Sequence, residues 1–331
     1  TGAGHMDIDL SVLRLLEREK EIPFDELVQI IEAAILAAYY KHIGEHPKGC
    51  RANLDRKTGH VAVFTAVLDE EGEPTETENE VTPEGFGRVA AYAAKQVIAQ
   101  RMREIADEGL LGEFKGKEGD IVAGQIQQGS RPYMVYVNLG SIEAIMPPEE
   151  QVPGEDYSHG RRIRVYVTSV QKGLRGPMIT VSRTHPNLVR KLFALEVPEV
   201  ASGHVEITSI AREAGHRTKI SVRSNEPGIN AKGACIGELG QRVRAVSSEL
   251  NEEKIDVVDH SENLAEFVAH ALSPAKVSSS FVIDAGLKAV RVLVPDFQLS
   301  LAIGKEGQNA RLAAKLTGAK IDIQPDSTMD E

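Results

Sequence analysis

The sequence predicts a multidomain α+β protein made of a helix and hairpin domain, a five-stranded β-barrel and two copies of one α/β unit. Three observations support this prediction: helical periodicity in the first third, strand-like alternation from residues 119 to 182, and a repeated order of elements after residue 185. With 331 residues and a hydrophobic content of 41%, the chain has room for roughly two to four domains. Each of them can bury a core of its own.

The predicted domains follow the changes in patterning. Residues 1–6 are assigned to a cloning remnant, 7–110 to an N-terminal domain with a long helical connector, 111–184 to the barrel, 185–260 and 261–326 to the two repeats, and 327–331 to a tail. The net charge of −11 is concentrated in residues 1–110, which carry −9, whereas residues 111–184 carry +1 and residues 185–331 carry −3. The argument that an acidic protein repels phosphate therefore applies only to the first third.

Two long helices are expected in the first third. Residues 24–43 carry apolar side chains at helical spacing, with two acidic residues in the first turn. A second helix is predicted to begin at Thr82 as the cap, with Pro83 in the first helical position, and to end at Gly109.

Between these helices the pattern predicts a single hairpin. Residues 51–68 contain two β-rich runs around a turn that ends in Gly59, where a positive φ is favoured. Residues 69–80 are acidic and have no apolar anchor, so we expect them to form a solvated, mobile loop.

Five short alternating runs between residues 119 and 182 predict a small closed barrel. They resemble an OB-fold of the ribosomal-protein S-one type, which implies RNA binding. Tyr133 and Tyr136 could both stack on bases; alternatively, because strand residues three apart face opposite ways, one lies in the barrel and one at the surface. Lys172 and Arg175 are further candidate RNA contacts, with a solvated charged face as the alternative.

The repeat is defined by two matching segments. Each runs helix, strand, strand, helix, loop, helix, strand, and the loop reads GELG at residues 237–240 and GKEG at residues 304–307. A loop with Gly at both ends lets the backbone approach a ligand, and the next helix presents unpaired N–H groups that suit a phosphate. One copy alone would be interpreted as a tight turn between helices, but two copies in the same order of elements favour binding.

This arrangement resembles the KH module, in which a G-x-x-G loop clamps about four nucleotides of RNA. Only the second loop contains a cation, Lys305, so the first is expected to use arginines of the next helix, and we expect modest affinity. The carboxylates of Glu238 and Glu306 are expected to point outward, and Gly304→Asp is expected to block binding without unfolding the chain. The candidate RNA-binding residues are Gly237, Glu238, Leu239, Gly240, Gln241, Arg242 and Arg244 in the first copy and Gly304, Lys305, Glu306, Gly307, Gln308, Asn309 and Arg311 in the second.

The barrel and the paired KH units, together with FGRVAAYAAKQVIAQR at 86–101 and GACIG at 233–237, resemble the NusA family of bacterial transcription factors over residues 7–326. The resemblance implies an N-terminal domain that docks on RNA polymerase, and a barrel and KH pair that bind the single-stranded nascent transcript. It also implies action in pausing, hairpin-dependent termination and antitermination, with other transcription factors as further partners. The acidic C-terminal repeats of some members do not occur in this sequence, so regulation through them is not expected.

We expect a cytoplasmic, monomeric binding protein with no cofactor, no metal, no catalytic residues and no membrane contact. No apolar run approaches the roughly 20 residues of a membrane span, and Cys50 and Cys235 lack zinc-site spacing. The sequence contains no Walker loop, His-Glu-x-x-His or Gly-x-Ser-x-Gly motif. Two alternatives stay open: an RNA-binding accessory part of a ribonuclease such as polynucleotide phosphorylase, and a ribosome-associated RNA adaptor.

Overall fold

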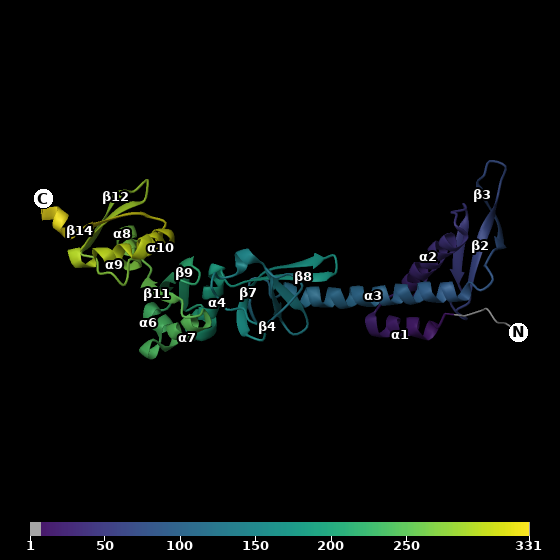
Figure 1. Cartoon of the computed structure of the whole chain (residues 1–331), viewed down its shortest axis with the longest axis horizontal. Helices are drawn as coiled ribbons and strands as arrows, with labels where there is room; N and C mark the ends of the chain where they lie inside the picture. The colour runs from purple at the N-terminus through teal and green to yellow at the C-terminus, as the bar shows by residue number, and fades with distance from the viewer. Residues whose placement is uncertain (1–7, 331) are drawn as a thin grey trace. The chain divides into compact units, whose positions relative to one another are not determined.

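The computed structural model describes residues 8–330, so the proposed cloning remnant lies outside the described residues. The chain forms two compact units, one up to Gly109 and one from Leu110 onward. Figure 1 shows the elements of both units, and each unit is described by itself below.

The first unit packs helices against one face of a three-stranded sheet. Its core is centred on Leu27, Ile31 and Ile35, which are spaced along one face of α2 and are fully buried. The helix predicted over residues 24–43 and the hairpin predicted over residues 51–68 are confirmed. The elements are α1 (Leu10–Lys20), α2 (Phe24–Ile43), β1 (Cys50–Leu54), β2 (Val61–Leu68), β3 (Pro74–Glu80) and α3 (Gly87–Lys115).

The acidic stretch is not the loop that its composition predicts. Only residues 69–73 form a turn, and β3 pairs antiparallel with β2 as an edge strand. Every residue of β3 is exposed, so burial cannot hold it; instead Arg51 forms an ion pair with Glu78 at 2.8 Å and Thr75 donates to the Val67 carbonyl at 2.6 Å. Backbone pairing and cross-strand contacts therefore order a segment whose composition resembles that of a disordered loop.

Helix α3 begins and ends later than predicted. Its first residue is Gly87, and the Thr82 hydroxyl accepts from the Val63 amide instead of capping a helix. The helix continues through Gly109 to Lys115. It does so because Phe114, just over one turn beyond Gly109, is buried in the barrel core, and this burial outweighs the helix cost of about 1 kcal/mol for a glycine.

The five strands predicted between residues 119 and 182 form a closed barrel, which confirms the OB-like part of the fold. The strand order is β4-β5-β6-β8-β7, and the interior is filled by alternating residues such as Val137, Val165 and Ile179. In Figure 1 the teal strands enclose this interior. The strands are β4 (Ile121–Gln127), β5 (Val135–Asn138), β6 (Glu143–Met146), β7 (Arg162–Gly173) and β8 (Gly176–Ser182).

The two repeats share one topology, as predicted. In each, the middle strand pairs antiparallel with the strand before it and parallel with the strand after it. The first copy consists of α4 (Pro186–Glu196), α5 (Pro198–Ala201), β9 (Val205–Glu213), β10 (Arg217–Ser224), α6 (Ala231–Ile236), α7 (Gln241–Glu249) and β11 (Lys254–Asp259). The second consists of α8 (Leu264–Ala271), β12 (Ser279–Asp284), β13 (Ala289–Val294), α9 (Leu299–Ile303), α10 (Gln308–Thr317) and β14 (Lys320–Pro325).

A buried arginine joins the barrel to the first repeat. Arg183 is fully buried and forms two hydrogen bonds to Glu155, at 2.8 and 3.0 Å. It also donates to the side chain of Glu249 at 3.1 Å and to the Glu249 backbone carbonyl at 2.9 Å. Because a buried charge is costly unless it is fully paired, this cluster holds the barrel and the end of α7 in one arrangement.

The two repeats are also packed together. The ammonium group of Lys219 in β10 lies 2.8 Å from Asp256 and donates to the carbonyl of Ser273 in the second copy at 2.6 Å. Burial lowers the pKa of Lys219, while the carboxylate of Asp256 opposes that shift. Ala211 and Val258 of the first copy belong to the core of the second. The connector between the repeats therefore joins domains that already share a packed interface.

Candidate nucleic-acid interface

The two G-x-x-G loops have the same backbone conformation. The first glycine has φ 76° and ψ 171° at Gly237, and φ 79° and ψ 166° at Gly304. The residue two positions on is left-handed in both copies, with φ 56° at Leu239 and φ 57° at Glu306. Two loops of different sequence therefore adopt one backbone geometry.

The first glycine of each loop is required by close packing. A Cβ on Gly304 would lie 2.7 Å from the Asn309 amide nitrogen, and one on Gly237 would lie 2.6 Å from the Cγ atom of Arg242. Gly304→Asp would therefore strain the fold itself, so the expectation that it spares the fold is wrong. Gly307 has open space around its Cβ position, the nearest atom being a guanidinium nitrogen of Arg311 at 3.9 Å, so it is the cleaner site for substitution.

The helix that follows each loop begins without a side-chain cap. Gly240 and Gly307 occupy the N-cap positions of α7 and α10 and offer no side-chain acceptor. The first amides, of Gln241 and Gln308, donate to the carbonyls of Glu238 and Lys305, no side chain caps the turn, and the positive end of the helix dipole lies at the loop. This geometry suits an anionic phosphate oxygen.

Two of the predicted contact residues are structural. Asn309 is fully buried and donates to the carbonyls of Leu272 and Ala302, each at 3.0 Å. Arg242, at the matching position of the first copy, donates to the Ala234 carbonyl at 2.9 Å and forms an ion pair with Glu199 at 2.8 Å. The fifth position after the first loop glycine thus bonds to the preceding helix in both copies. The burial of Asn309 contradicts its predicted contact with RNA, whereas Arg242 is partly exposed and its contact stays a prediction.

The exposed cations differ between the copies. Arg244 and Arg311 occupy matching positions, and each places a guanidinium nitrogen 3.9 Å from the Cβ position of the last loop glycine. Arg311 also contacts Glu213 of the first copy at 2.5 Å, and Gln308 donates to the same carboxylate at 2.7 Å. The hydrogen bond from Arg311 lowers the pKa of Glu213. Lys305 is exposed at the tip of the second loop.

The loop carboxylates lie at the surface, in agreement with the expectation that they point outward. Glu238 and Glu306 are exposed, and Gln241 is exposed at the start of α7. Leu239 is 87% exposed, which is unusual for a leucine and offers an apolar contact at the tip of the first loop.

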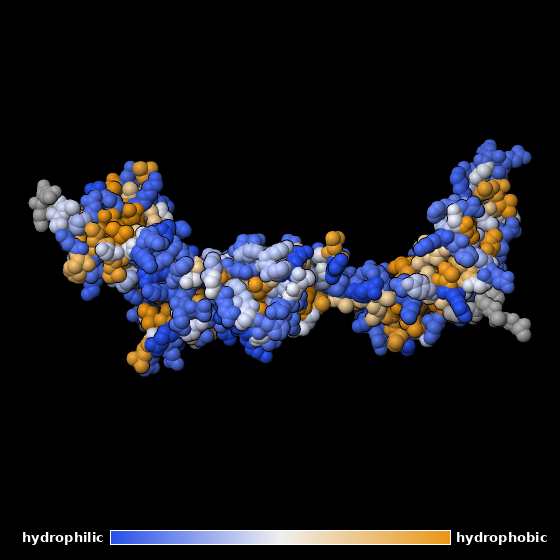
Figure 2. All heavy atoms as spheres, in the orientation of Figure 1, coloured by the Kyte–Doolittle hydropathy of each residue, from blue (hydrophilic) through white to orange (hydrophobic). Residues whose placement is uncertain are grey.

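The sequence reasoning missed an apolar surface next to the second loop. Phe297 is 81% exposed just before α9, and Leu301 and Ile303 of α9 are partly exposed. Figure 2 shows apolar residues gathered on the face of the second repeat that is in view. The signal in the sequence was the run DFQLSLAI, in which more apolar side chains occur than one buried face of a short helix needs.

The barrel presents one of its two candidate tyrosines. Tyr133 precedes β5 and is 58% exposed, whereas Tyr136 within β5 is 9% exposed and packs against Gly129. The structure therefore shows the alternative of one tyrosine at the surface and one packed away, and it does not bring Tyr136 to an open face. Lys172 in β7 and Arg175 in the following turn are both exposed.

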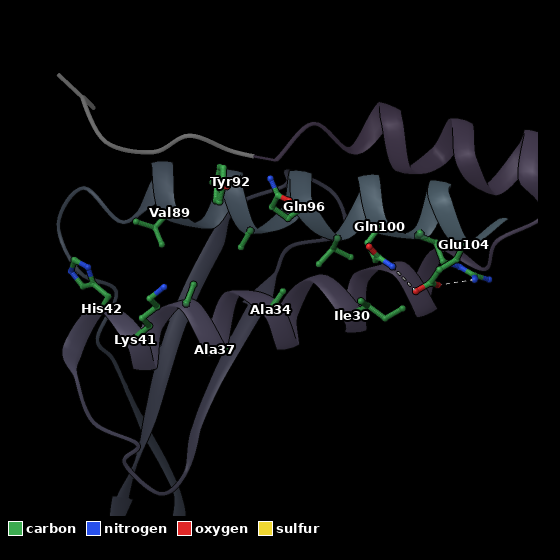
Figure 3. Close-up of a pocket in the computed structure, with 14 residues that line it drawn as sticks. Ile30, Ala34, Ala37, Lys41, His42, Val89, Tyr92, Gln96, Gln100 and Glu104 are labelled. Atoms are coloured by element: carbon green, nitrogen blue, oxygen red, sulfur yellow. Dashed lines mark hydrogen bonds and ion pairs between the residues drawn. The ribbon is translucent and has the colours of Figure 1, made fainter. Parts of the chain in front are cut away.

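The first unit contains a groove between α2 and α3. The two helices run antiparallel, and small side chains such as Ala34 and Ala37 line a hollow of about 730 Å³ (Figure 3). Val89 and Tyr92 line it from α3, and an ion pair between Arg101 and Glu104 at 3.4 Å lies toward the end of the groove that Ile30 also lines. The lining is mostly apolar, and this groove was not predicted from the sequence.

The fold and the duplicated loops define a class of protein, the RNA-binding proteins with tandem KH modules. Residues 183–260 match the NusA-like first KH domain, 264–331 the NusA-like second KH domain and 10–82 the NusA N-terminal domain. The chain is 56% identical to the transcription termination/antitermination protein NusA of Mycobacterium tuberculosis, over 97% of this chain and 94% of the relative. It is 46% identical to NusA of Bacillus subtilis, over 97% and 92%.

The chain belongs to the NusA family of transcription termination/antitermination proteins. This membership confirms the resemblance seen in the sequence and does not favour the ribonuclease or ribosome-adaptor alternatives. Among residues 8–330, no helix is long and apolar enough to cross a membrane. The described residues also contain no cluster of three or more histidine, cysteine or acidic side chains placed to hold a metal ion.

Proposed function

We propose that the two KH loops hold one continuous single strand of nascent RNA. The observation that carries this proposal is the shared backbone geometry of residues 237–240 and 304–307, each leading into a helix without a side-chain cap. Per-module footprints of about four nucleotides give a combined length of roughly eight. Because the repeats are packed together through Lys219 and Ser273, the two loops keep a fixed separation.

In this proposal the backbone amides bind phosphate, and the exposed side chains strengthen the binding of RNA. Arg244, Lys305 and Arg311 supply positive charge, and Gly237, Gly240, Gly304 and Gly307 allow close approach. Leu239 and Phe297 offer apolar surfaces on which bases can pack. Holding the transcript extended would oppose or guide hairpin formation, which connects the site to pausing and to hairpin-dependent termination.

The first unit would dock on RNA polymerase. The groove between α2 and α3 has the shape and apolar lining that accept one face of an amphipathic helix, so we assign it to a helical segment of polymerase. Docking would place a weak RNA binder next to the emerging transcript, where the effective concentration reaches about the millimolar range. The chain would act as a cytoplasmic monomer, by binding instead of catalysis, with other transcription factors as further partners.

The loop proposal is tested by Gly240→Asp combined with Gly307→Asp. An added carboxylate at each loop should repel phosphate and weaken binding of an eight-nucleotide RNA by at least about tenfold, because hydrogen bonds to charged groups contribute about 1.5 to 3 kcal/mol each. The slope of the logarithm of affinity against the logarithm of salt concentration should become shallower by about 0.7 for each phosphate that the variant no longer binds. Fluorescence anisotropy titration at several salt concentrations measures both quantities.

Gly318→Asp is the matched control. Gly318 also has a left-handed backbone, with φ 75°, and ends the helix α10 that Gly307 begins. The control introduces the same charge and the same backbone strain at the far end of that helix. Equal RNA affinity in the double loop variant and in the wild-type chain would refute the proposal.

A further inference from the structure

The two loops differ in what surrounds the helix that follows them. In the second copy, Glu213 at the end of β9 reaches from the first repeat to the start of α10. Its carboxylate accepts from the Gln308 side chain at 2.7 Å and from Nε of Arg311 at 2.5 Å. In the first copy the matching side chains, Gln241 and Arg244, are exposed and form no side-chain hydrogen bond or ion pair in the described part of the chain. The first loop is therefore open, whereas a carboxylate holds the polar side chains of the second.

The side chains held by Glu213 flank the position that the proposed function assigns to a phosphate. Gln308 is the first residue of α10, where the positive end of the helix dipole favours an anion. The guanidinium group of Arg311 also donates to the Glu306 carbonyl at 3.0 Å, so it lies against the loop backbone. Carboxylates and phosphates both bind arginine through anionic oxygens. Glu213 therefore presents, from within the protein, the kind of group that RNA would bring.

The backbone that carries Glu213 is fixed, but its side chain has room to move. The Ser209 hydroxyl, in the same strand, donates to the Leu316 carbonyl near the end of α10 at 3.0 Å, and Glu213 pairs with Arg217 in the sheet. The Glu213 side chain is 20% exposed, so it can rotate into solvent without movement of the strand. The hydrogen bond from Arg311 lowers the pKa of Glu213, so the side chain is an anion at neutral pH.

We propose that Glu213 competes with RNA phosphate for Arg311 and Gln308, and thereby lowers the affinity of the second loop for RNA. Ion pairs that are partly exposed are weak, so a bound phosphate can displace the carboxylate. The first loop has no such competitor. The proposal rests on the KH function above and names a residue that sets the affinity of its second loop.

The test follows each loop separately in the intact chain. A mixed-sequence RNA tetranucleotide is titrated into isotope-labelled protein, and the amide NMR signals of Gly240 and Gly307 report on the two loops. Because one module binds about four nucleotides, this probe does not bridge both. Glu213→Gln keeps an oxygen that accepts hydrogen bonds and removes the negative charge. It should lower the RNA concentration at the Gly307 midpoint by about three- to tenfold and leave the Gly240 midpoint unchanged.

Arg311→Gln separates competition for the arginine from a general effect of charge. If Glu213 acts by holding Arg311, adding Glu213→Gln to a chain that already carries Arg311→Gln should shift the Gly307 midpoint much less than it does in the wild-type chain. Glu206→Gln is the matched control. Glu206 lies near the other end of β9, about 23 Å away, and forms an ion pair of its own with Arg223 at 3.0 Å. This control should leave both midpoints unchanged.

Two results would overturn the proposal. If Glu213→Gln leaves the Gly307 midpoint unchanged or raises it, Glu213 does not compete with RNA, and a raised midpoint would show that it positions Arg311 for binding. If the shift is equally large in the Arg311→Gln chain, Glu213 acts through its charge alone. Failure of the KH proposal is recognised separately, because neither the Gly240 nor the Gly307 signal of the wild-type chain would then move.

Discussion

At the scale of single residues, polar side chains near the loops have two different uses. Asn309 and Arg242 look like RNA contacts in the sequence because they are polar and follow a G-x-x-G loop, yet both hold the preceding helix through its carbonyls. Arg244 and Arg311, two residues further along, lie beside the loop. Sequence spacing predicted the loops but could not show which side of the first helical turn faces the protein.

His185 provides a pH prediction. Its Nδ1 atom accepts from the Asn187 amide at 3.0 Å and caps α4, and its ring stacks on Tyr166 with centroids 4.5 Å apart. Burial lowers the pKa of His185 below its ordinary value of 6.5, with Glu150 opposing the shift and Arg212 adding to it. At pH values between the lowered pKa and 6.5, the unfolded chain binds more protons than the folded one, and the free energy of unfolding rises with pH. The stability that depends on a neutral His185 is therefore complete above about pH 6.5.

Stability of the second unit should therefore decline as the pH falls from about 6.5 through the lowered pKa of His185. His185→Asn keeps a side-chain oxygen at the cap and removes the titrating group, so its stability should depend less on pH in that range. Urea unfolding of both proteins at pH 7.5 and pH 5.5 measures the difference. An identical loss of stability in both would rule out His185 as the source.

At the scale of elements, local patterns identified most helices and strands but missed β3 and misplaced both ends of α3. Strand β3 is ordered by pairing with β2, and α3 is extended past Gly109 by the burial of Phe114. Both errors arise because composition describes the intrinsic preference of a segment, whereas its neighbours supply the remaining free energy.

The limit of α3 gives a second prediction. Gly109 lies inside the helix with open space at its Cβ position, so Gly109→Ala should stabilise the protein by about 0.5 to 1 kcal/mol. Gly85, which precedes the helix, has φ 75° and equally open space, so Gly85→Ala should destabilise it by a similar amount. Thermal unfolding distinguishes the two. A lower melting temperature for Gly109→Ala would mean that the helix ends there, as the sequence alone suggested.

At the scale of the whole molecule, charge is divided unevenly between the acidic N-terminal third and the nearly neutral remainder of the chain. The net charge of −9 over residues 1–110 does not favour RNA, and the groove between α2 and α3 is lined mainly by apolar side chains. Binding of polymerase and binding of RNA should therefore be separable by substitution in the intact chain.

Ala37→Arg tests this separation. Ala37 is exposed and lines the groove, so an arginine there should block a docking helix without disturbing the core. Ala33→Arg is the control, because Ala33 is an exposed residue of the same helix outside the groove. Ala37→Arg should abolish effects on pausing and polymerase binding while leaving RNA affinity unchanged. Full polymerase binding by this variant would show that another surface docks.

The sequence by itself determined the duplicated unit and the positions of both loops, because these follow from periodicity and from glycine spacing within short segments. The family was predicted from the resemblance of quoted segments to known members. The tertiary structure alone decided which loop-flanking side chains are buried, how Arg183 and Lys219 join the domains, and where the groove between α2 and α3 lies. Burial and charge pairing depend on residues far apart in the chain, and no local pattern specifies them.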